Sequence, residues 1–162
     1  MASNYSPIVR KAVESDSSAI VALIDALADY EKLARPDEEA RIRLARDLFG
    51  PRPKIDCLLA FMDGYPVGYA IILETYSSFL ARPTLYLEDL FVLPEYRGRK
   101  VGLALFEEIR NEANRRECGR IEWTVLDWNR LAIDFYDRLG GECLKEWLHY
   151  RITLPSKISS TV

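Results

Sequence analysis

The stretch LPEYRGRKVGLALFEEI, residues 93–109, places three cationic side chains and two glycines between an apolar run and a helical pattern. Val101, Leu105 and Ile109 repeat at the spacing of a helix that buries one face. The first N–H groups of a helix have no partner within it and carry partial positive charge. A glycine in the preceding turn lets a bound group approach the backbone closely. The stretch therefore predicts a strand, a tight turn and a helix whose N-terminus can bind an anion such as a phosphate.

The same stretch has a simpler interpretation, in which Gly98 makes a bend and the charges of Arg97, Arg99 and Lys100 face water. The chain contains neither of two well-known phosphate loops, G-x-x-x-x-G-K-[ST] or a G-x-G-x-x-G that follows the first strand. From the residues of this turn alone, the anion site and the solvated turn both stay open.

The rest of the chain alternates between strand-like and helix-like patterns. Helical patterns cover residues 15–33, 37–49, about 100–117 and 130–140. Strand patterns cover residues 7–13, 55–63, 67–76, 84–93, 120–127 and 144–154. This order predicts an α/β fold of the α+β type, with a central mixed sheet and helices on both faces.

Composition limits the class of protein. A chain of 162 residues with 49% apolar and 29% charged residues is typical of one globular domain, so we expect a single domain over 1–162 with a loose tail over 155–162. The net charge of −3 and the single short basic cluster argue against a nucleic-acid partner. No apolar run is long enough for a membrane span, so no membrane partner is expected. Three cysteines without metal-ligand spacing favour a reducing, cytoplasmic location and no metal site.

The turn resembles the acyl-CoA pyrophosphate loop of the GNAT N-acetyltransferases, whose pattern is [QR]-x-x-G-x-[GA]. One residue departs from the family, because Lys100 stands where a glycine is usual. The resemblance implies acetyl-CoA as the acetyl donor and a twisted, mostly antiparallel sheet of six to seven strands. The loop residues that it implies as the acetyl-CoA site are Arg97, Gly98, Arg99, Lys100, Val101, Gly102 and Leu103.

The flanking segments resemble the diamine (spermidine/spermine) N-acetyltransferase branch of that family. They are LYLEDLFV, DWNRLAIDFYDRLGG, ALADYEK and a tryptophan in the last strand pattern. The resemblance implies an acetyl-CoA-binding core over about 84–140, and a homodimer to whose interface the last strand contributes. It implies a bulge in the strand 84–93, which exposes backbone to the pantetheine of CoA. The further cofactor contacts that it implies are Leu90, Phe91, Val92, Asn129 and Tyr136.

Amine acetylation needs a neutral amine, but an alkyl ammonium has a pKa of about 10.4. A general base is therefore useful. By resemblance, Glu88 takes this role through a water molecule, although it could instead pair with an arginine. The departing CoA thiolate benefits from a proton, and the resemblance assigns its donor as Tyr136, whose alternative role is packing in the core. Asn129 is also a good N-cap by residue type.

An acidic pocket would select a cationic acceptor. The positions that resemble the amine site of the diamine branch are Tyr30, Glu31, Glu88, Asp89 and Trp147. Two acidic residues of the branch are Ser77 and Lys145 here, which favours a small acceptor such as a diamine or a lysine- or thialysine-like amino acid over spermine. The lone His149 is expected to be structural. Two alternatives stay open: an acetyltransferase for a protein or peptide amine, and a CoA-binding regulatory module without turnover.

Overall fold

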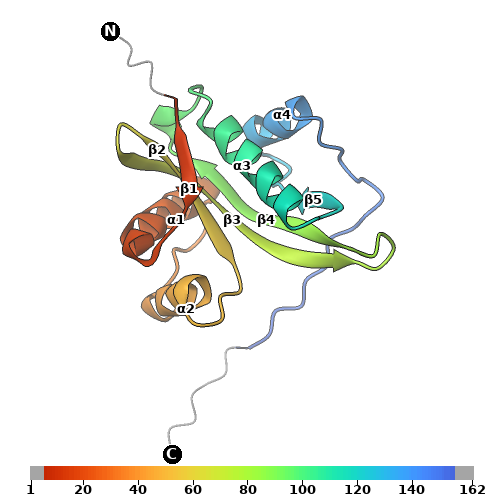
Figure 1. Ribbon diagram of the computed structural model, residues 1–162, viewed down its shortest axis with the longest axis horizontal. Coiled ribbons are helices and arrows are strands. Elements are labelled where there is room, and N and C mark those ends of the chain that lie inside the picture. Colours follow the sequence, from red (N-terminus) through yellow and green to blue (C-terminus); the bar gives the residue numbers. More distant parts are fainter. Residues whose placement is uncertain (1–5, 156–162) are drawn as a thin grey trace, which may run out of the picture. The chain divides into compact units, whose positions relative to one another are not determined.

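A computed structural model describes residues 6–155 of the chain (Figure 1). These residues form two compact units that divide between Thr124 and Val125. The N-terminal unit holds one sheet with helices on both of its faces, and the C-terminal unit holds one helix and an extended segment. None of the helices within residues 6–155 has the length and apolar character that crossing a bilayer requires.

The sheet of the N-terminal unit has five strands in the order β1-β2-β3-β4-β5. Neighbouring strands run antiparallel, except that β4 and β5 run parallel. The mixed, mostly antiparallel sheet that was predicted is therefore confirmed. The strand bounds are β1 Ile8–Lys11, β2 Asp56–Met62, β3 Tyr65–Ser77, β4 Arg82–Val92 and β5 Arg120–Trp123.

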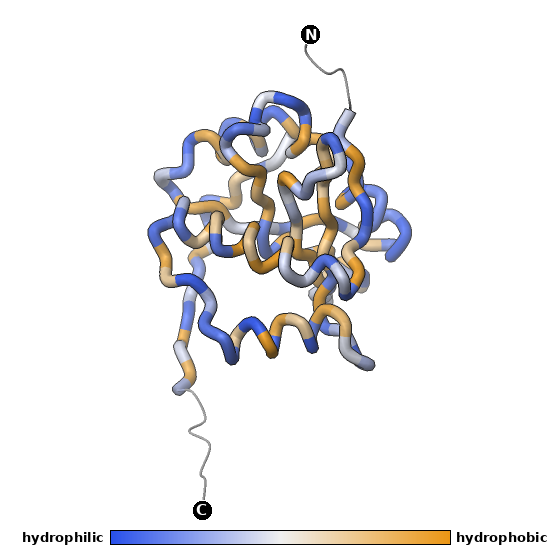
Figure 2. Tube along the Cα trace, turned by 90° about the vertical axis from the view of Figure 1, so that its left-hand side faces the viewer, coloured by the Kyte–Doolittle hydropathy of each residue, from blue (hydrophilic) through white to orange (hydrophobic). Residues whose placement is uncertain are grey.

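Helices cover both faces of this sheet (Figure 1). On one face, Ile20 and Leu23 of the first helix pack with Tyr69 and Phe91 in a buried cluster. On the other face, a Cβ added to Gly68 would lie 3.4 Å from Leu105 Cδ1, which shows how closely α3 approaches the sheet. In Figure 2, hydrophobic residues gather toward the middle of the tube and hydrophilic residues toward its outside. The bounds are η1 Glu14–Asp16, α1 Ser17–Glu31, α2 Glu38–Phe49, η2 Pro94–Tyr96 and α3 Val101–Arg115.

The C-terminal unit begins after Thr124 and contains α4, Arg130–Arg138. Asn129 is its N-cap, because its side-chain oxygen accepts a hydrogen bond from the Ala132 N–H at 3.2 Å. The predicted strand over 144–154 is not formed within the described residues, and the prediction of six to seven strands was therefore too high. A strand needs a neighbour for its N–H and C=O groups, and residues 125–155 contain no second strand to provide one. Most of the predicted loose tail, residues 156–162, lies outside the described residues.

Candidate active site

β4 carries a bulge at Glu88, in the middle of the strand. Ile71 of β3 pairs with Asp89 and the next residue, Ile72, pairs with Leu87, so Glu88 is the extra residue. A bulge bends its strand and increases the local twist. The bulge that the resemblance implied is therefore present, and it leaves the Glu88 side chain exposed.

The bulge coincides with the point where β4 and β5 part. The parallel pairing runs from Thr84 with Arg120 to Leu87 with Trp123, and β5 ends there, four residues before the predicted end of the strand. Among the described strands, residues 88–92 of β4 pair only with β3. The edge of β4 that carries Leu90, Phe91 and Val92 thus has backbone groups outside the sheet ladder.

The turn after β4 leads from the end of this strand into α3. Gly98 has a φ of 74°, and Lys100, the N-cap residue, has a φ of 65° and a ψ of 10°. Both lie in the left-handed region that favours glycine. Lys100 therefore adopts the conformation of the glycine that it replaces in the motif. No side chain caps the helix, which leaves the N–H groups at its start directed toward the turn.

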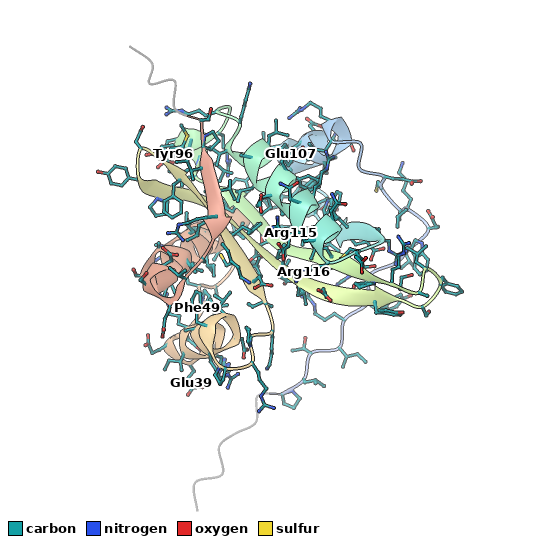
Figure 3. The ribbon with its side chains drawn as sticks, viewed as in Figure 1. Glu39, Phe49, Tyr96, Glu107, Arg115 and Arg116 are labelled. Carbon is teal, nitrogen blue, oxygen red and sulfur yellow. The ribbon has the colours of Figure 1, made fainter. Side chains whose placement is uncertain are left out.

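Two of the three cationic side chains of the turn lie against aromatic rings. The Arg97 guanidinium lies 4.8 Å from the centroid of the Tyr30 ring, and its Nε donates to the Val92 carbonyl at 3.0 Å. The Arg99 guanidinium lies 5.4 Å from the ring of Tyr96, which Figure 3 labels. Arg97 thus connects the phosphate-loop motif to the end of α1, where Tyr30 and Glu31 lie.

Three carboxylates, Glu31, Glu88 and Asp89, form what we call the acidic group. The Asp89 side chain is partly buried, and its Oδ2 accepts a hydrogen bond from the Tyr69 hydroxyl at 3.1 Å. Burial raises the pKa of Asp89 to about 6, and the charges of Glu88 and Glu31 add to the effect while the Tyr69 hydrogen bond opposes it. Burial also raises the pKa of Glu31.

Tyr69, which donates to Asp89, is a contact of the acidic group that the sequence pattern did not predict. Its side chain is fully buried, and burial raises its pKa, so the hydroxyl keeps its proton and acts as a donor. A buried tyrosine hydroxyl requires a hydrogen-bond partner. A tyrosine within the apolar run VGYAIIL was the available signal, but the partner is set by the pairing of β3 with β4 and not by the local pattern.

The remaining predicted site residues lie in the C-terminal unit. Burial raises the pKa of Tyr136 on α4 to about 12, so its phenol is protonated at neutral pH and is able to donate. Asn129 caps the same helix. Trp147 is 72% exposed and lies in the segment that forms no strand. Each of these positions remains a prediction for acetyl-CoA or amine binding.

Within residues 6–155 no cluster of three or more His, Cys, Asp or Glu side chains is arranged to hold a metal ion. The N-terminal unit offers three polar features to a ligand. They are the unpaired edge of β4, the N-terminus of α3 without a side-chain cap, and the acidic group. The first two offer hydrogen-bond donors and acceptors of the backbone, and the third offers negative charge.

Comparison with known proteins identifies the family. The family model described as "Acetyltransferase (GNAT) family" matches residues 20–141. The thialysine N-epsilon-acetyltransferase of Mus musculus is 34% identical over 154 residues, which cover 88% of this chain and 90% of that protein. The spermidine/spermine N(1)-acetyltransferase-like protein 1 of Homo sapiens is 30% identical over 140 residues, 82% of this chain and 20% of that protein.

The fold agrees with this assignment. A crystal structure of a probable acetyltransferase superimposes with a TM-score of 0.80 and 18% identity, over 93% of this chain and 99% of that one. This likeness shows that the two chains share a fold, and the family model covers most of the length of this chain. The chain therefore belongs to the GNAT family of acetyltransferases, and it is an N-acetyltransferase by family.

Proposed function

We propose that this enzyme transfers the acetyl group of acetyl-CoA to a primary amine of a small cationic molecule. The acceptor class is a diamine, a polyamine or a lysine- or thialysine-like amino acid. The observation that carries the proposal is the acidic group, which lies next to the bulge of β4 and at the end of α1. The names of the relatives, which acetylate thialysine or belong to the spermidine/spermine type, agree with this class.

The donor site is proposed at the edge of β4 and the turn before α3. The edge that carries residues 90–92 offers N–H and C=O groups to the amides of pantetheine, as a neighbouring strand would. The turn offers the N–H groups at the start of α3 and the left-handed residues Gly98 and Lys100 to the diphosphate. The loop positions assigned to this site are Arg97, Gly98, Arg99, Lys100, Val101, Gly102 and Leu103.

The acceptor site is proposed at the acidic group, with Tyr30 as an aromatic neighbour. Trp147 is proposed as an amine contact from the sequence resemblance alone. Three carboxylates attract an ammonium and exclude an anion. Ser77 replaces an acidic residue of the diamine branch, and its Oγ accepts a hydrogen bond from the Leu80 N–H at 3.2 Å, which fits a role in the turn between β3 and β4. With this change and Lys145, the site carries less negative charge than a long polyamine would require, so a small acceptor is favoured.

The reaction is proposed to proceed by direct attack in a ternary complex. One carboxylate of the acidic group takes a proton from the acceptor ammonium, directly or through water, and the neutral amine attacks the thioester carbonyl. The sequence resemblance points to Glu88 for this step. Tyr136, whose phenol is protonated at neutral pH, is proposed to give a proton to the departing CoA thiolate. Asn129 is proposed to contact the donor.

We further propose that the enzyme is a cytoplasmic homodimer. The support is the resemblance to the diamine branch and the apolar side chains that alternate along the segment after α4. Leu148, Tyr150 and Ile152 are 73%, 85% and 89% exposed, a pattern that suits pairing with a second strand. Sedimentation equilibrium of the purified protein tests this, and a single species at the mass of one chain, 18.6 kDa, would contradict it.

The experiment that tests the function is CoA release with acetyl-CoA fixed and a panel of amines varied. The panel contains lysine, ornithine, thialysine, putrescine, spermidine, spermine and a basic peptide. Saturable turnover of a small amine is the expected result. Turnover of the peptide alone would favour a protein acetyltransferase, and acetyl-CoA binding without any turnover would favour a regulatory module.

A further inference from the structure

The acidic group contains two neighbouring carboxylates whose surroundings differ. Glu88 is the bulged residue of β4 and is exposed, whereas Asp89 is partly buried and accepts the hydrogen bond of Tyr69. We infer that Asp89, positioned by the Tyr69 hydroxyl, and not Glu88, accepts the proton of the acceptor ammonium. This inference rests on the proposed function and assigns one step within the same site.

The pairing of β3 with β4 fixes the position of Asp89. Asp89 and Phe91 are two residues apart and lie on the same face of β4, and Phe91 pairs with Tyr69 across the sheet. The rings of Tyr69 and Phe91 are 6.4 Å apart, and both belong to the buried cluster beneath α1. The Tyr69 hydroxyl therefore reaches Asp89 from a side chain that the core holds in one position.

The hydrogen bond uses only one of the two carboxylate oxygens. Tyr69 donates to Oδ2 at 3.1 Å, whereas Oδ1 has no hydrogen-bond partner among residues 6–155. A carboxylate oxygen has two lone pairs that can accept hydrogen bonds, and Oδ1 does not belong to the fully buried, unpartnered atoms of the described residues, so a ligand can reach it. Oδ1 is thus left to accept an N–H of a bound ammonium, while Tyr69 prevents the carboxylate from rotating away.

The groups around Asp89 raise its proton affinity. Glu31 approaches from α1, and Glu88 adjoins it on β4; both are acidic. Cys57 on β2 stays neutral, because burial and the carboxylates raise the pKa of its thiol to about 12. Arg97 of the turn is directed to the rings of Tyr30 and Phe91 and to the Val92 carbonyl. Burial and like charge thus bring the pKa of Asp89 to about 6.

This environment suits a proton acceptor at neutral pH. A base is most effective when its pKa lies near the working pH, because it is then both ionised and able to bind a proton. The step moves one proton from the ammonium nitrogen to Asp89 Oδ1, so that an ion pair becomes a neutral amine and a neutral carboxylic acid. The amine keeps its lone pair for attack on the thioester carbonyl. Loss of both charges is favoured where water is partly excluded.

The test compares pH profiles of kcat/KM for the wild type, Tyr69→Phe and Glu88→Gln with the amine that the panel identifies. The wild type should lose activity below about pH 6, where Asp89 is protonated. Tyr69→Phe removes the hydrogen bond that favours the carboxylate, so this acidic limb should move up by roughly one pH unit. Glu88→Gln removes a like charge, so the limb should move slightly down. The ionisation of the amine is common to all profiles and cancels in the comparison.

The control is Tyr65→Phe, which removes the hydroxyl of a tyrosine of the same strand that is 69% exposed. Its limb should coincide with that of the wild type. Loss of the limb in Glu88→Gln, or an unmoved limb in Tyr69→Phe, would overturn the inference in favour of Glu88. Carbon-13 NMR titration of the Asp89 carboxyl in the wild type separates this question from the proposed function. A midpoint near pH 6 supports the inference even in the absence of turnover, and a midpoint below pH 5 overturns it.

Discussion

Lys100 lies in a backbone conformation that glycine adopts more easily. An L-residue in the left-handed region is disfavoured by about 1 kcal/mol relative to glycine. We therefore expect Lys100→Gly to raise the free energy of unfolding in urea by about 0.5–1 kcal/mol, part of the gain being offset by the greater freedom of the unfolded chain. A lower free energy of unfolding would contradict this account of the turn.

Lys32 provides a matched control for that variant. It ends α1 with a φ of 57° and a ψ of 38°, and it lies outside the proposed donor site. Lys32→Gly should give a similar gain in stability and leave acetyl-CoA affinity unchanged. Weaker acetyl-CoA binding in Lys100→Gly alone would then show that the Lys100 ammonium contributes to the diphosphate site, and tighter binding would show that the lysine is an imperfect substitute for glycine.

Asp89 should lower stability at neutral pH because its pKa is raised from 3.8 to about 6. The folded protein holds the proton more tightly than the unfolded chain, so ionisation above pH 6 costs about 3 kcal/mol at most. Asp89→Asn, whose side-chain carbonyl can still accept the Tyr69 hydrogen bond, should be more stable than the wild type at pH 8. The difference should shrink as the pH falls through 6 and vanish near pH 4. Urea unfolding at these three values measures it.

Asp29 gives the opposite sign and serves as the comparison. Its hydrogen bond with Arg35, at 2.6 Å, lowers the pKa of its carboxyl. A lowered pKa contributes stability above the pKa of the unfolded chain, and this stability is lost as the pH falls through the folded-state value. Asp29→Asn should therefore lose stability at pH 8. If Asp89→Asn also loses stability at pH 8, the raised pKa of Asp89 in the folded protein is contradicted.

Among the elements, α3 is joined to the sheet by Arg116, the residue that follows it (Figure 3). The guanidinium contacts Asp56 of β2 at 2.6 Å, Glu74 of β3 at 3.4 Å and Glu112 of α3 at 2.6 Å. Its side chain is only 19% exposed, so the pairs are less screened than surface pairs. Arg116→Met should lower the free energy of unfolding by about 2 kcal/mol, because it leaves Asp56 and Glu112 partly buried with fewer partners.

Arg43 on α2 is the control for this effect. It pairs with Glu39 of the same helix at 3.5 Å, and the two side chains are 54% and 87% exposed. An exposed pair of this kind contributes less than about 0.5 kcal/mol. Arg43→Met should therefore leave urea unfolding nearly unchanged. Equal losses for the two variants would mean that the charges around Arg116 do not hold α3 to the sheet.

At the scale of the whole molecule, the order of elements was predictable where each element carries its own pattern. The predicted helix over 37–49 corresponds to α2, Glu38–Phe49, and the strand patterns over 55–63 and 67–76 correspond to the paired strands β2 and β3. The prediction of a last strand over 144–154 was wrong. Alternating apolar residues in this range indicate which side chains a strand would bury, but they do not indicate whether a partner strand is present. The family and its loop motif could be recognised because the motif is contiguous.

The internal arrangement of the candidate site was less predictable. Glu88 and Asp89 were identified from the sequence, but their different environments depend on which residue is bulged and on the pairing of β3 with β4. The contact of Tyr69 with Asp89 joins residues 20 positions apart. A local sequence pattern does not predict this contact, because the contact depends on the register of β3 and β4.

The early end of β5 has a consequence for amide hydrogen exchange. Beyond Leu87, the N–H groups on the outer edge of β4 have no ladder partner among the described strands, and unpartnered amides exchange rapidly with deuterium. Acetyl-CoA should slow exchange in a peptide that spans residues 88–92 and leave a peptide from the centre of β2 unchanged. Unaltered exchange in 88–92 at saturating acetyl-CoA would place the donor elsewhere. The edge thus reports where the donor binds, independently of turnover.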